Sequence, residues 1–353
     1  MRVAIAGAAA LTAEGHVMNL GDEAIADTLG AAVAQHASVS RVVTALNVRL
    51  AGGDPPSGRF SPRPVFALER EVAEADAVLI GGGTMLQEDV LPRHRLAVRG
   101  LLRYQLAVSL ACIARRTPYA YALVGAEMLD RPGARRVAKF LIEHAACVAV
   151  RDGPSGRMVR ALASPKRLAV GADAVFLAAW PSCPAAARSR IAVSLRIDCS
   201  SDALRLLAQG LDEMFPDAGI LLVPTDRRLN ADARKLREFR SVLAAPERAL
   251  WFPPTGGWRE LVHELESCRL AVGMRMHFIM FAALAGAPSI GLAPSLKLRS
   301  FAQDSGVRLI DGSDTKALLA ALVGAVPVEQ KVIEALRRRA EFGLAECLAA
   351  VAR

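Results

Sequence analysis

His277 is the residue whose setting in the sequence best suits acid–base chemistry. It follows the apolar run 270–272, begins a helical pattern and has Arg275 two positions before it. The free amides of a helix N-terminus and a neighbouring arginine both attract anions. A phosphate or carboxylate bound there would favour the protonated imidazole. We therefore expect His277 to act as a general acid that is protonated when an anionic substrate binds.

Two further polar stretches follow predicted strands or begin predicted helices. One is Asn19-Leu-Gly-Asp-Glu, which opens a helical pattern, and the other is the loop 81–84, which follows the apolar run 77–80. Helix capping and a tight turn would explain them without a ligand. Their positions also suit contacts with an anion or a sugar hydroxyl. We expect ligand contacts from Asn19, Gly21, Asp22, Gly82, Gly83 and Thr84.

Several cations also lie just beyond predicted strands, namely Arg151, Arg196, Arg275 and Lys297. Metal ligation is not expected, because the chain has no His-Glu-x-x-His motif and no cluster of cysteine and histidine. A Gly-x-Ser-x-Gly nucleophile motif is also absent. The sequence therefore favours general acid–base catalysis combined with binding of an anion by arginine and lysine.

The composition is that of a folded protein with a basic surface. Of 353 residues, 53% are hydrophobic and 22% charged, and the formal net charge is +9. This excess favours anionic partners. Aromatic residues are scarce in the basic stretches, so we expect no nucleic-acid partner. Six scattered cysteines, no signal-peptide pattern and no apolar segment near twenty residues predict a cytoplasmic protein without a membrane span.

The order of the predicted elements indicates an α/β protein with two Rossmann-like domains facing a cleft. Short apolar strands alternate with helices up to about residue 174, and the same alternation restarts at residue 191. We predict an N-terminal domain at 1–177, a linker rich in proline and alanine at 178–189, and a C-terminal domain at 190–353. Ligands in such sheets bind beyond the carboxyl ends of the strands, where the polar residues above lie.

Four sequence blocks resemble the polysaccharide pyruvyl transferase family. They are Asn19-Leu-Gly-Asp-Glu-Ala-Ile, Asp76-Ala-Val-Leu-Ile-Gly-Gly-Gly-Thr, Val150-Arg-Asp-Gly-Pro-Ser, and Val272-Gly-Met-Arg-Met-His with the lysine at 297 downstream. They occur in the family's order and extend over most of the chain, from residue 1 to about 306. The loop at 8–18 and Asp173-Ala-Val, in place of Asp-Pro, depart from the family's pattern.

The resemblance implies a fold similar to the B-type glycosyltransferases and a transfer of pyruvate from phosphoenolpyruvate onto two hydroxyls of one sugar. His277 would be the general acid, and Arg151 and Lys297 would bind or position the donor. The acceptor would lie near Asn19, Asp22 and Gly82, with Asp22 as a candidate base. No cofactor is implied, because phosphoenolpyruvate is the donor substrate itself.

Two other functions stay open from the sequence. The first is a nucleotide-sugar-dependent glycosyltransferase on the same architecture, since a fold does not determine a function. The second is a non-catalytic sugar-binding relative. If the acceptor is a lipid-linked precursor, the protein would work at the inner face of the membrane, and the basic tail helix around residues 337–339 is a candidate for peripheral membrane contact.

Overall fold

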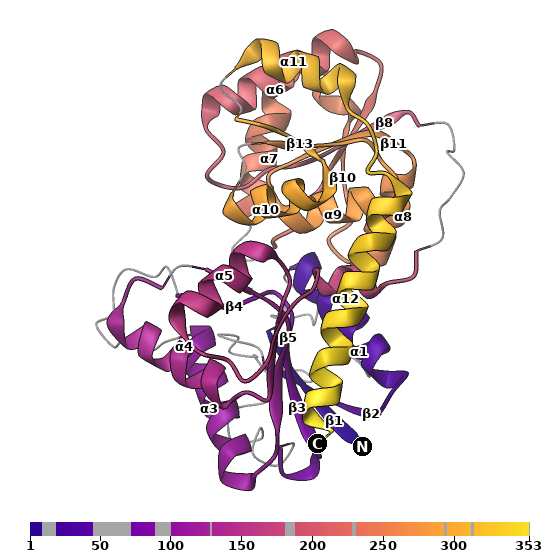
Figure 1. The fold of residues 1–353 in the computed structure, drawn as a ribbon. Coiled ribbons are helices and arrows are strands. Elements are labelled where there is room, and N and C mark those ends of the chain that lie inside the picture. The colour runs from indigo at the N-terminus through magenta and orange to yellow at the C-terminus, as the bar shows by residue number, and fades with distance from the viewer. Residues whose placement is uncertain are drawn as a thin grey trace, which may run out of the picture. The chain divides into compact units, whose positions relative to one another are not determined.

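A computed structural model describes residues 1–8, 19–44, 72–88, 100–127, 129–180, 188–227, 231–292, 295–311 and 314–352 of the chain. These residues form two compact units, each built on a parallel sheet with helices (Figure 1). Unit 1 comprises residues 1–17, 22–178 and 335–353, and unit 2 comprises residues 18–21 and 179–334. The predicted α/β class with two Rossmann-like domains is confirmed.

Unit 1 is a doubly wound sheet. Its strands are β1 (Arg2–Ala8), β2 (Ser38–Thr44), β3 (Ala77–Gly81), β4 (Thr84–Leu86), β5 (Tyr119–Ala126), β6 (Cys147–Val150) and β7 (Leu168–Val170). Its helices are α1 (Leu20–Ala34), α3 (Gly100–Arg115), α4 (Pro132–His144) and α5 (Gly153–Leu162), with a 3-10 turn at Ala174–Leu177.

The strand order in unit 1 places the glycine loop beside the switch point of the sheet. The order is β2-β1-β3-β5-β6-β7, and β4 pairs with β5. The chain turns from one direction across the sheet to the other between β1 and β3, and the carboxyl end of β3 leads directly into Gly82 and Gly83. Such a switch point is where open α/β sheets bind ligands.

Unit 2 repeats this architecture. Its strands are β8 (Arg190–Ser194), β9 (Gly219–Leu222), β10 (Ala249–Trp251), β11 (Cys268–Gly273), β12 (Ser289–Leu292) and β13 (Arg308–Ile310). Its helices are α6 (Ser201–Met214), α7 (Ala231–Ser241), α8 (Trp258–Glu266), α9 (Met276–Leu284), α10 (Leu296–Ser305) and α11 (Thr315–Gly324), and the 3-10 turn Pro246–Arg248 precedes β10. The order β10-β9-β8-β11-β12-β13 puts the switch point between β8 and β11.

The tail of the chain belongs to a different unit from the one predicted. Helix α12 (Gln330–Val351) begins in unit 2, but from residue 335 onward it belongs to unit 1. Arg339 Nε donates to the carbonyl of Gly171 (3.1 Å), and the Cys347 thiol contacts the carbonyl of Tyr121 (3.2 Å). Cys347 is fully buried there, so apolar packing adds to these polar contacts.

The unit boundaries therefore differ from the predicted domains at two places. The tail residues 335–353 lie with unit 1 instead of the C-terminal domain, and residues 18–21 lie with unit 2 instead of the N-terminal domain. The main division between Ala178 and Ala179 lies at the start of the predicted linker. Residues 181–187 of that linker lie outside the described residues.

The glycine loop after β3 needs glycine for two separate reasons. Gly82 and Gly83 have φ values of +80° and +69°, in the left-handed region that side chains disfavour. A Cβ on Gly82 would also overlap the side chain of Ile25 in α1, whereas a Cβ on Gly83 would find its nearest neighbour, Asp22 Oδ1, at 3.6 Å. The loop and α1 of unit 1 are thus packed closely at Gly82.

We expect Gly82→Ala to lower the free energy of unfolding by about 3 kcal/mol, because backbone strain and the overlap with Ile25 add together. Gly83→Ala is the matched control, since it has the strain without the overlap and should cost about 1 kcal/mol. Urea unfolding of both variants measures the difference. Equal losses would contradict the close packing of the loop on Ile25.

Candidate functional site

His277 occupies the first turn of α9, directly beyond the switch point of unit 2. Helix α9 has the sequence Met-His-Phe-Ile-Met-Phe-Ala-Ala-Leu, and all of its residues except His277 are buried. A helix that is apolar on every side belongs inside a domain. The one polar side chain of α9 therefore lies just beyond the carboxyl end of β11, which pairs with β8 at the switch point.

The imidazole of His277 lies against the backbone of Gly21. A Cβ on Gly21 would overlap three ring atoms of His277, namely Nδ1, Cγ and Cε1. Gly21 comes from the Asn19-Leu-Gly motif, so two motifs far apart in the sequence meet inside unit 2. Glycine at position 21 provides the volume that the ring occupies.

Backbone pairing and a cap hold this motif in place. The Asn19 side-chain oxygen accepts a hydrogen bond from the backbone N–H of Gly21 (2.9 Å), as expected of a residue that caps a helix. Asn19 also forms an antiparallel bridge with Asp226, and the backbone N–H of Leu20 donates to the carbonyl of Thr225 (3.1 Å). The start of α1 is thus anchored to the segment that follows β9.

Arg275 is paired with two carboxylates. Its Nε and Nη2 donate to the two oxygens of Asp232 at 3.0 and 2.6 Å, and Nη2 lies 3.4 Å from Asp226 Oδ2. Asp232 also accepts from the backbone N–H of Asp226 (3.0 Å). The bidentate pair therefore joins the N-terminus of α9 to the segment that anchors Asn19.

Asp232 is fully buried, and this burial raises the pKa of its carboxyl above the usual value. The negative charge of Asp226 raises it further, while Arg275 and the backbone N–H of Asp226 lower it. A buried carboxylate without its cation is costly, so Asp232 and Arg275 depend on each other. This dependence favours a positioning role for Arg275 in addition to the predicted contact with a donor anion.

The other predicted cations of unit 2 also lie beyond strand ends. Arg196 follows β8 and donates to Asp198 (2.7 Å) at the surface. Lys297 is half-buried in the first turn of α10, which follows β12, the neighbour of β11 in the sheet. Because strands of a parallel sheet end at one edge, Lys297 and His277 emerge from adjacent strands at the same edge.

Arg151 lies in unit 1, where it is almost completely buried. Its guanidinium donates to Asp152 (3.4 Å), Asp173 (3.4 Å) and the Thr84 hydroxyl (3.1 Å). It lies so close to Gly125 that a Cβ there would be 2.8 Å from the guanidinium carbon. Arg151 thus connects the glycine loop to the ends of β5, β6 and β7.

The structure groups most of the predicted residues into two sets. In unit 2 it brings together Asn19, Gly21, Arg275 and His277. In unit 1 it joins Thr84 to Arg151, and Gly83 lies beside Asp22 of the first turn of α1. Asp22 and Gly21 are neighbours in sequence, so the same motif contributes a residue to each set.

Sequence reasoning missed the carboxylates that hold the two arginines, Asp226 and Asp232 in unit 2 and Asp152 and Asp173 in unit 1. It also missed the hydrogen bond between the hydroxyls of Ser194 and Thr225 (2.6 Å), which joins the ends of β8 and β9. The available signal was position, because Thr225 and Asp226 closely follow the strand β9. Asp232, in the first turn of α7, offered no comparable signal.

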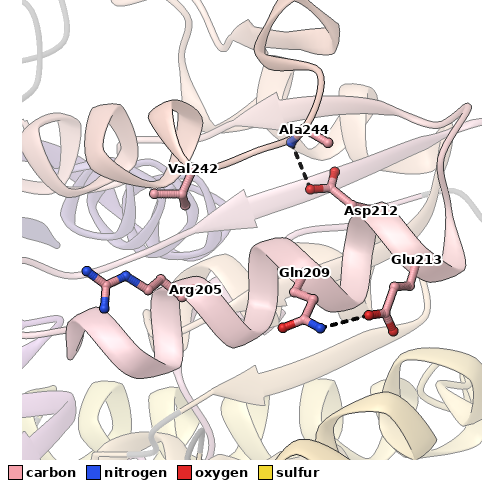
Figure 2. Close-up of a pocket in the computed structure, with 6 residues that line it drawn as sticks. All are labelled: Arg205, Gln209, Asp212, Glu213, Val242 and Ala244. Atoms are coloured by element: carbon pink, nitrogen blue, oxygen red, sulfur yellow. Dashed lines mark hydrogen bonds between the residues drawn. The ribbon is translucent and has the colours of Figure 1, made fainter.

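An open depression in unit 2 lies outside these sets. Figure 2 shows two hydrogen bonds among its lining residues, one from Gln209 to Glu213 (2.8 Å) and one from the backbone N–H of Ala244 to Asp212 (2.9 Å). Its lining residues are Arg205, Gln209, Asp212, Glu213, Val242 and Ala244, none of which was predicted to bind a ligand. Within the described ranges, no group of three or more histidine, cysteine, aspartate or glutamate residues is arranged to hold a metal ion.

A family model for polysaccharide pyruvyl transferases matches residues 19–295. The chain belongs to the polysaccharide pyruvyl transferase family. The matched region includes Asn19, Arg151 and His277, and it ends two residues before Lys297. No curated protein matches the chain in sequence.

Solved structures of similar fold include two UDP-GlcNAc 2-epimerases. The Neisseria meningitidis enzyme matches with a TM-score of 0.59 and 12% identity over 99% of this chain and 100% of its own. The Methanocaldococcus jannaschii enzyme matches with a TM-score of 0.56 and 12% identity over 92% of each chain. A sucrose-phosphate synthase from Thermosynechococcus elongatus matches with a TM-score of 0.52 and 13% identity, over 98% of this chain and 96% of its own. These matches confirm the predicted likeness to the B-type glycosyltransferase fold.

Gly21→Ala should displace the imidazole of His277 while leaving the fold intact, because the new methyl group requires the volume of the ring. A displaced ring is more exposed, so diethylpyrocarbonate should modify His277 several times faster, as measured by mass spectrometry of the peptide. Gly219→Ala is the control, since its Cβ has no neighbour closer than 3.5 Å. An unchanged rate at His277 in Gly21→Ala would contradict the contact.

Asp232→Asn should lower the free energy of unfolding by about 2 kcal/mol, because it leaves the partly buried charge of Arg275 without its bidentate partner. Asp198→Asn removes the same charge from a surface pair with Arg196 and should cost less than about 0.5 kcal/mol. Urea unfolding compares the two variants. Equal effects would show that the buried pair does not hold the segment after β9.

Proposed function

We propose that this family member transfers pyruvate from phosphoenolpyruvate onto two hydroxyls of one sugar, in a polysaccharide or its lipid-linked precursor, to form a cyclic ketal. The observation that carries the proposal is the contact between His277 and Gly21 beyond the switch point of unit 2. It joins the two polar motifs that the family model covers, and its one ionisable group is an imidazole suited to proton transfer.

The reaction needs one proton delivered to carbon. In the proposed sequence, His277 protonates the methylene carbon of phosphoenolpyruvate, and the adjacent carbon gains oxocarbenium character. The first sugar hydroxyl attacks that carbon, phosphate leaves, and the second hydroxyl closes the ketal. One hydroxyl proton replaces the proton that His277 gave, and the other ends on the leaving phosphate, which departs as hydrogen phosphate. Asp22 is a candidate base for the hydroxyl protons.

Binding of the donor requires positive groups for its phosphate and its carboxylate. The carboxylates of Asp226 and Asp232 already offset the charge of Arg275, and those of Asp152 and Asp173 offset the charge of Arg151. We assign the donor anion to Lys297 and to the first-turn amides of α9, because α10 and α9 begin beyond adjacent strands of the sheet in unit 2. Arg275 and Arg151 would orient their surroundings and contribute the remaining charge.

The contacts proposed for the acceptor follow from the same motifs. Asn19, Gly82 and Thr84 lie at helix or strand ends where sugar hydroxyls could be bound, and Arg196 lies beyond β8. No cofactor is required, because the donor carries both the transferred group and the leaving group. We place the reaction in the cytoplasm, at the inner face of the membrane when the acceptor is lipid-linked; no helix among the described residues is long and apolar enough to cross a bilayer.

The main alternative is transfer from a nucleotide sugar. It is favoured by the fold neighbours, which include a UDP-GlcNAc 2-epimerase bound to UDP-GlcNAc and a sucrose-phosphate synthase. Their identities of 12% and 13% establish the fold alone. Purified protein should be incubated with a panel of sugar acceptors and either phosphoenolpyruvate or nucleotide sugars. Nucleotide release without phosphate release would exclude pyruvyl transfer.

His277→Asn should reduce phosphate release from phosphoenolpyruvate by about a hundredfold or more, the scale expected for removal of a general acid. His263→Asn is the matched control, because His263 is an exposed histidine of α8 in the same unit. The control should keep wild-type turnover, and both variants should keep the wild-type unfolding transition. Full turnover in His277→Asn would contradict the assigned role, and absence of turnover in every arm would favour a sugar-binding relative.

A further inference from the structure

One side of unit 1 is covered by helices whose outward residues carry almost only positive charge. Helices α3, α4 and α5 lie along the same side of the sheet, and α3 packs against α4 (Figure 1). Their exposed cations are Arg103, Arg115, Arg135, Arg136, Lys139, Arg157 and Arg160. The three helices contain a single acidic residue, Glu143, which is paired with Lys139 (3.8 Å). We call these exposed residues, together with Leu110 and Ile113, the basic helical face.

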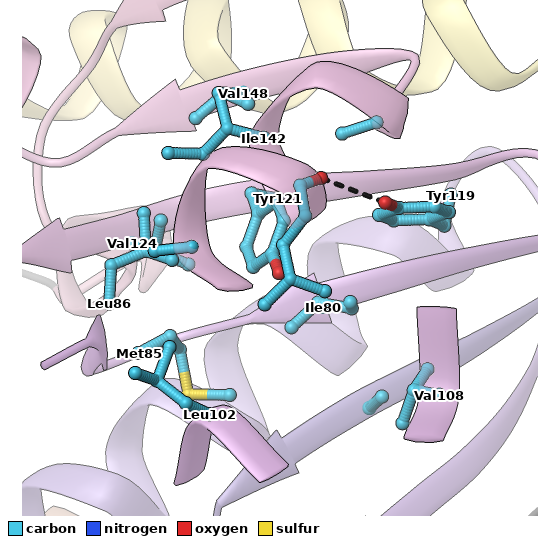
Figure 3. Packing of buried hydrophobic residues seen from close by; sticks show 14 of the residues in the cluster. Ile80, Met85, Leu86, Leu102, Val108, Tyr119, Tyr121, Val124, Ile142 and Val148 are labelled. Carbon is cyan, nitrogen blue, oxygen red and sulfur yellow. Dashed lines mark hydrogen bonds between the residues drawn. The ribbon is translucent and has the colours of Figure 1, made fainter. Parts of the chain in front are cut away.

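The inner faces of these helices are occupied by the core. Figure 3 shows Leu102 and Val108 of α3 and Ile142 of α4 among the buried residues around Tyr119 and Tyr121 of β5. Since these side chains are committed to the core, the cations on the opposite faces point away from the sheet. The cations therefore lie at the surface of unit 1.

The same face exposes aliphatic side chains on α3. Leu110 is 49% exposed and Ile113 is 39% exposed, and the spacing of three residues places them on one stripe. Arg103 precedes Leu110 by seven residues, about two turns, so this cation lies on the same side of α3 as the stripe. An apolar stripe bordered by arginine is the arrangement of helices that lie in the interface of an anionic bilayer.

We propose that the basic helical face binds the surface of an anionic membrane, with Leu110 and Ile113 entering the headgroup layer. The positive charges of this face complement the negative phosphates of lipid headgroups. Each cation near such a surface strengthens binding roughly fivefold. Nucleic acid fits less well, because exposed aliphatic side chains gain nothing from a phosphate backbone. The three helices also present no exposed aromatic ring for base stacking.

The structure argues against the tail helix as this surface. Arg337 donates to the carbonyl of Ala178 (3.1 Å) and Arg339 to that of Gly171 (3.1 Å), both within unit 1. Two of the three arginines on which the sequence-based expectation rested therefore serve the packing of α12. The proposal concerns binding alone and does not depend on the reaction proposed above.

The test is sedimentation of the full chain with vesicles of phosphatidylcholine, alone or mixed with about a third of phosphatidylglycerol. The wild type should bind only the anionic vesicles. Arg135→Glu/Arg136→Glu should weaken binding by at least tenfold, on the scale of roughly fivefold per cation. Leu110→Ser/Ile113→Ser should weaken it severalfold through loss of insertion.

Matched controls in unit 2 separate this face from general effects. Arg234→Glu/Arg237→Glu makes the same charge change on exposed residues of α7, and Val323→Ser/Val326→Ser removes exposed aliphatic groups. Because Val323 and Val326 are more exposed than Leu110 and Ile113, they test exposure at least as severely. Both controls should bind like the wild type, and all variants should keep its unfolding transition. The proposal is overturned if the wild type does not bind the anionic vesicles, or if the controls lose as much binding as the variants of the basic helical face. It is also overturned if the Leu110 and Ile113 variant binds fully, because the face would then be a general polyanion-binding patch. Tighter binding to an oligonucleotide than to vesicles would also overturn it.

Discussion

The space that Gly21 leaves for the imidazole of His277 is the constraint on which the candidate site depends. Because the ring packs directly on the Gly21 backbone, the start of α1 must be fixed relative to α9. The hydrogen bond from Gly21 to the Asn19 side chain is local to the start of α1 and does not fix it. The fixing comes from the bridge between Asn19 and Asp226, and the backbone of Asp226 is in turn held by Asp232. A fully buried carboxylate at the base of this chain of contacts makes the arrangement rigid but dependent on its charge partner, Arg275.

The two units share one arrangement of side chains beyond the carboxyl ends of their strands. Each has one arginine beyond a strand end, held by two aspartates, with glycine backbone or a glycine motif packed nearby. Arginines paired in this way position the neighbouring loops, because two carboxylates already offset their charge. The positive excess of the chain is therefore carried by other residues, many of them on the outer helices of unit 1. The arginines at the strand ends and the cations of the basic helical face are thus separate sets.

The sequence predicted local features well and long-range pairings poorly. Apolar strands that lead into polar residues located the edges of both sheets, and the placement of His277 at a strand-to-helix junction was confirmed. The partners of Arg151 and Arg275 could not be predicted, because Asp173 and Asp232 are brought to them only by the folded chain. The return of α12 to unit 1 was missed for the same reason, since an amphipathic pattern does not name the surface that a helix will cover.

The decisive step of the proposed reaction is the transfer of a proton from His277 to the methylene carbon of phosphoenolpyruvate. The isotopic content of the product formed in deuterated water tests this step. With phosphoenolpyruvate and a productive acceptor, we expect one deuterium in the methyl group of each ketal and an equal amount of released phosphate. Both should be lost together in His277→Asn. A ketal methyl group without solvent deuterium, or a sugar product formed only from a nucleotide sugar, would contradict it.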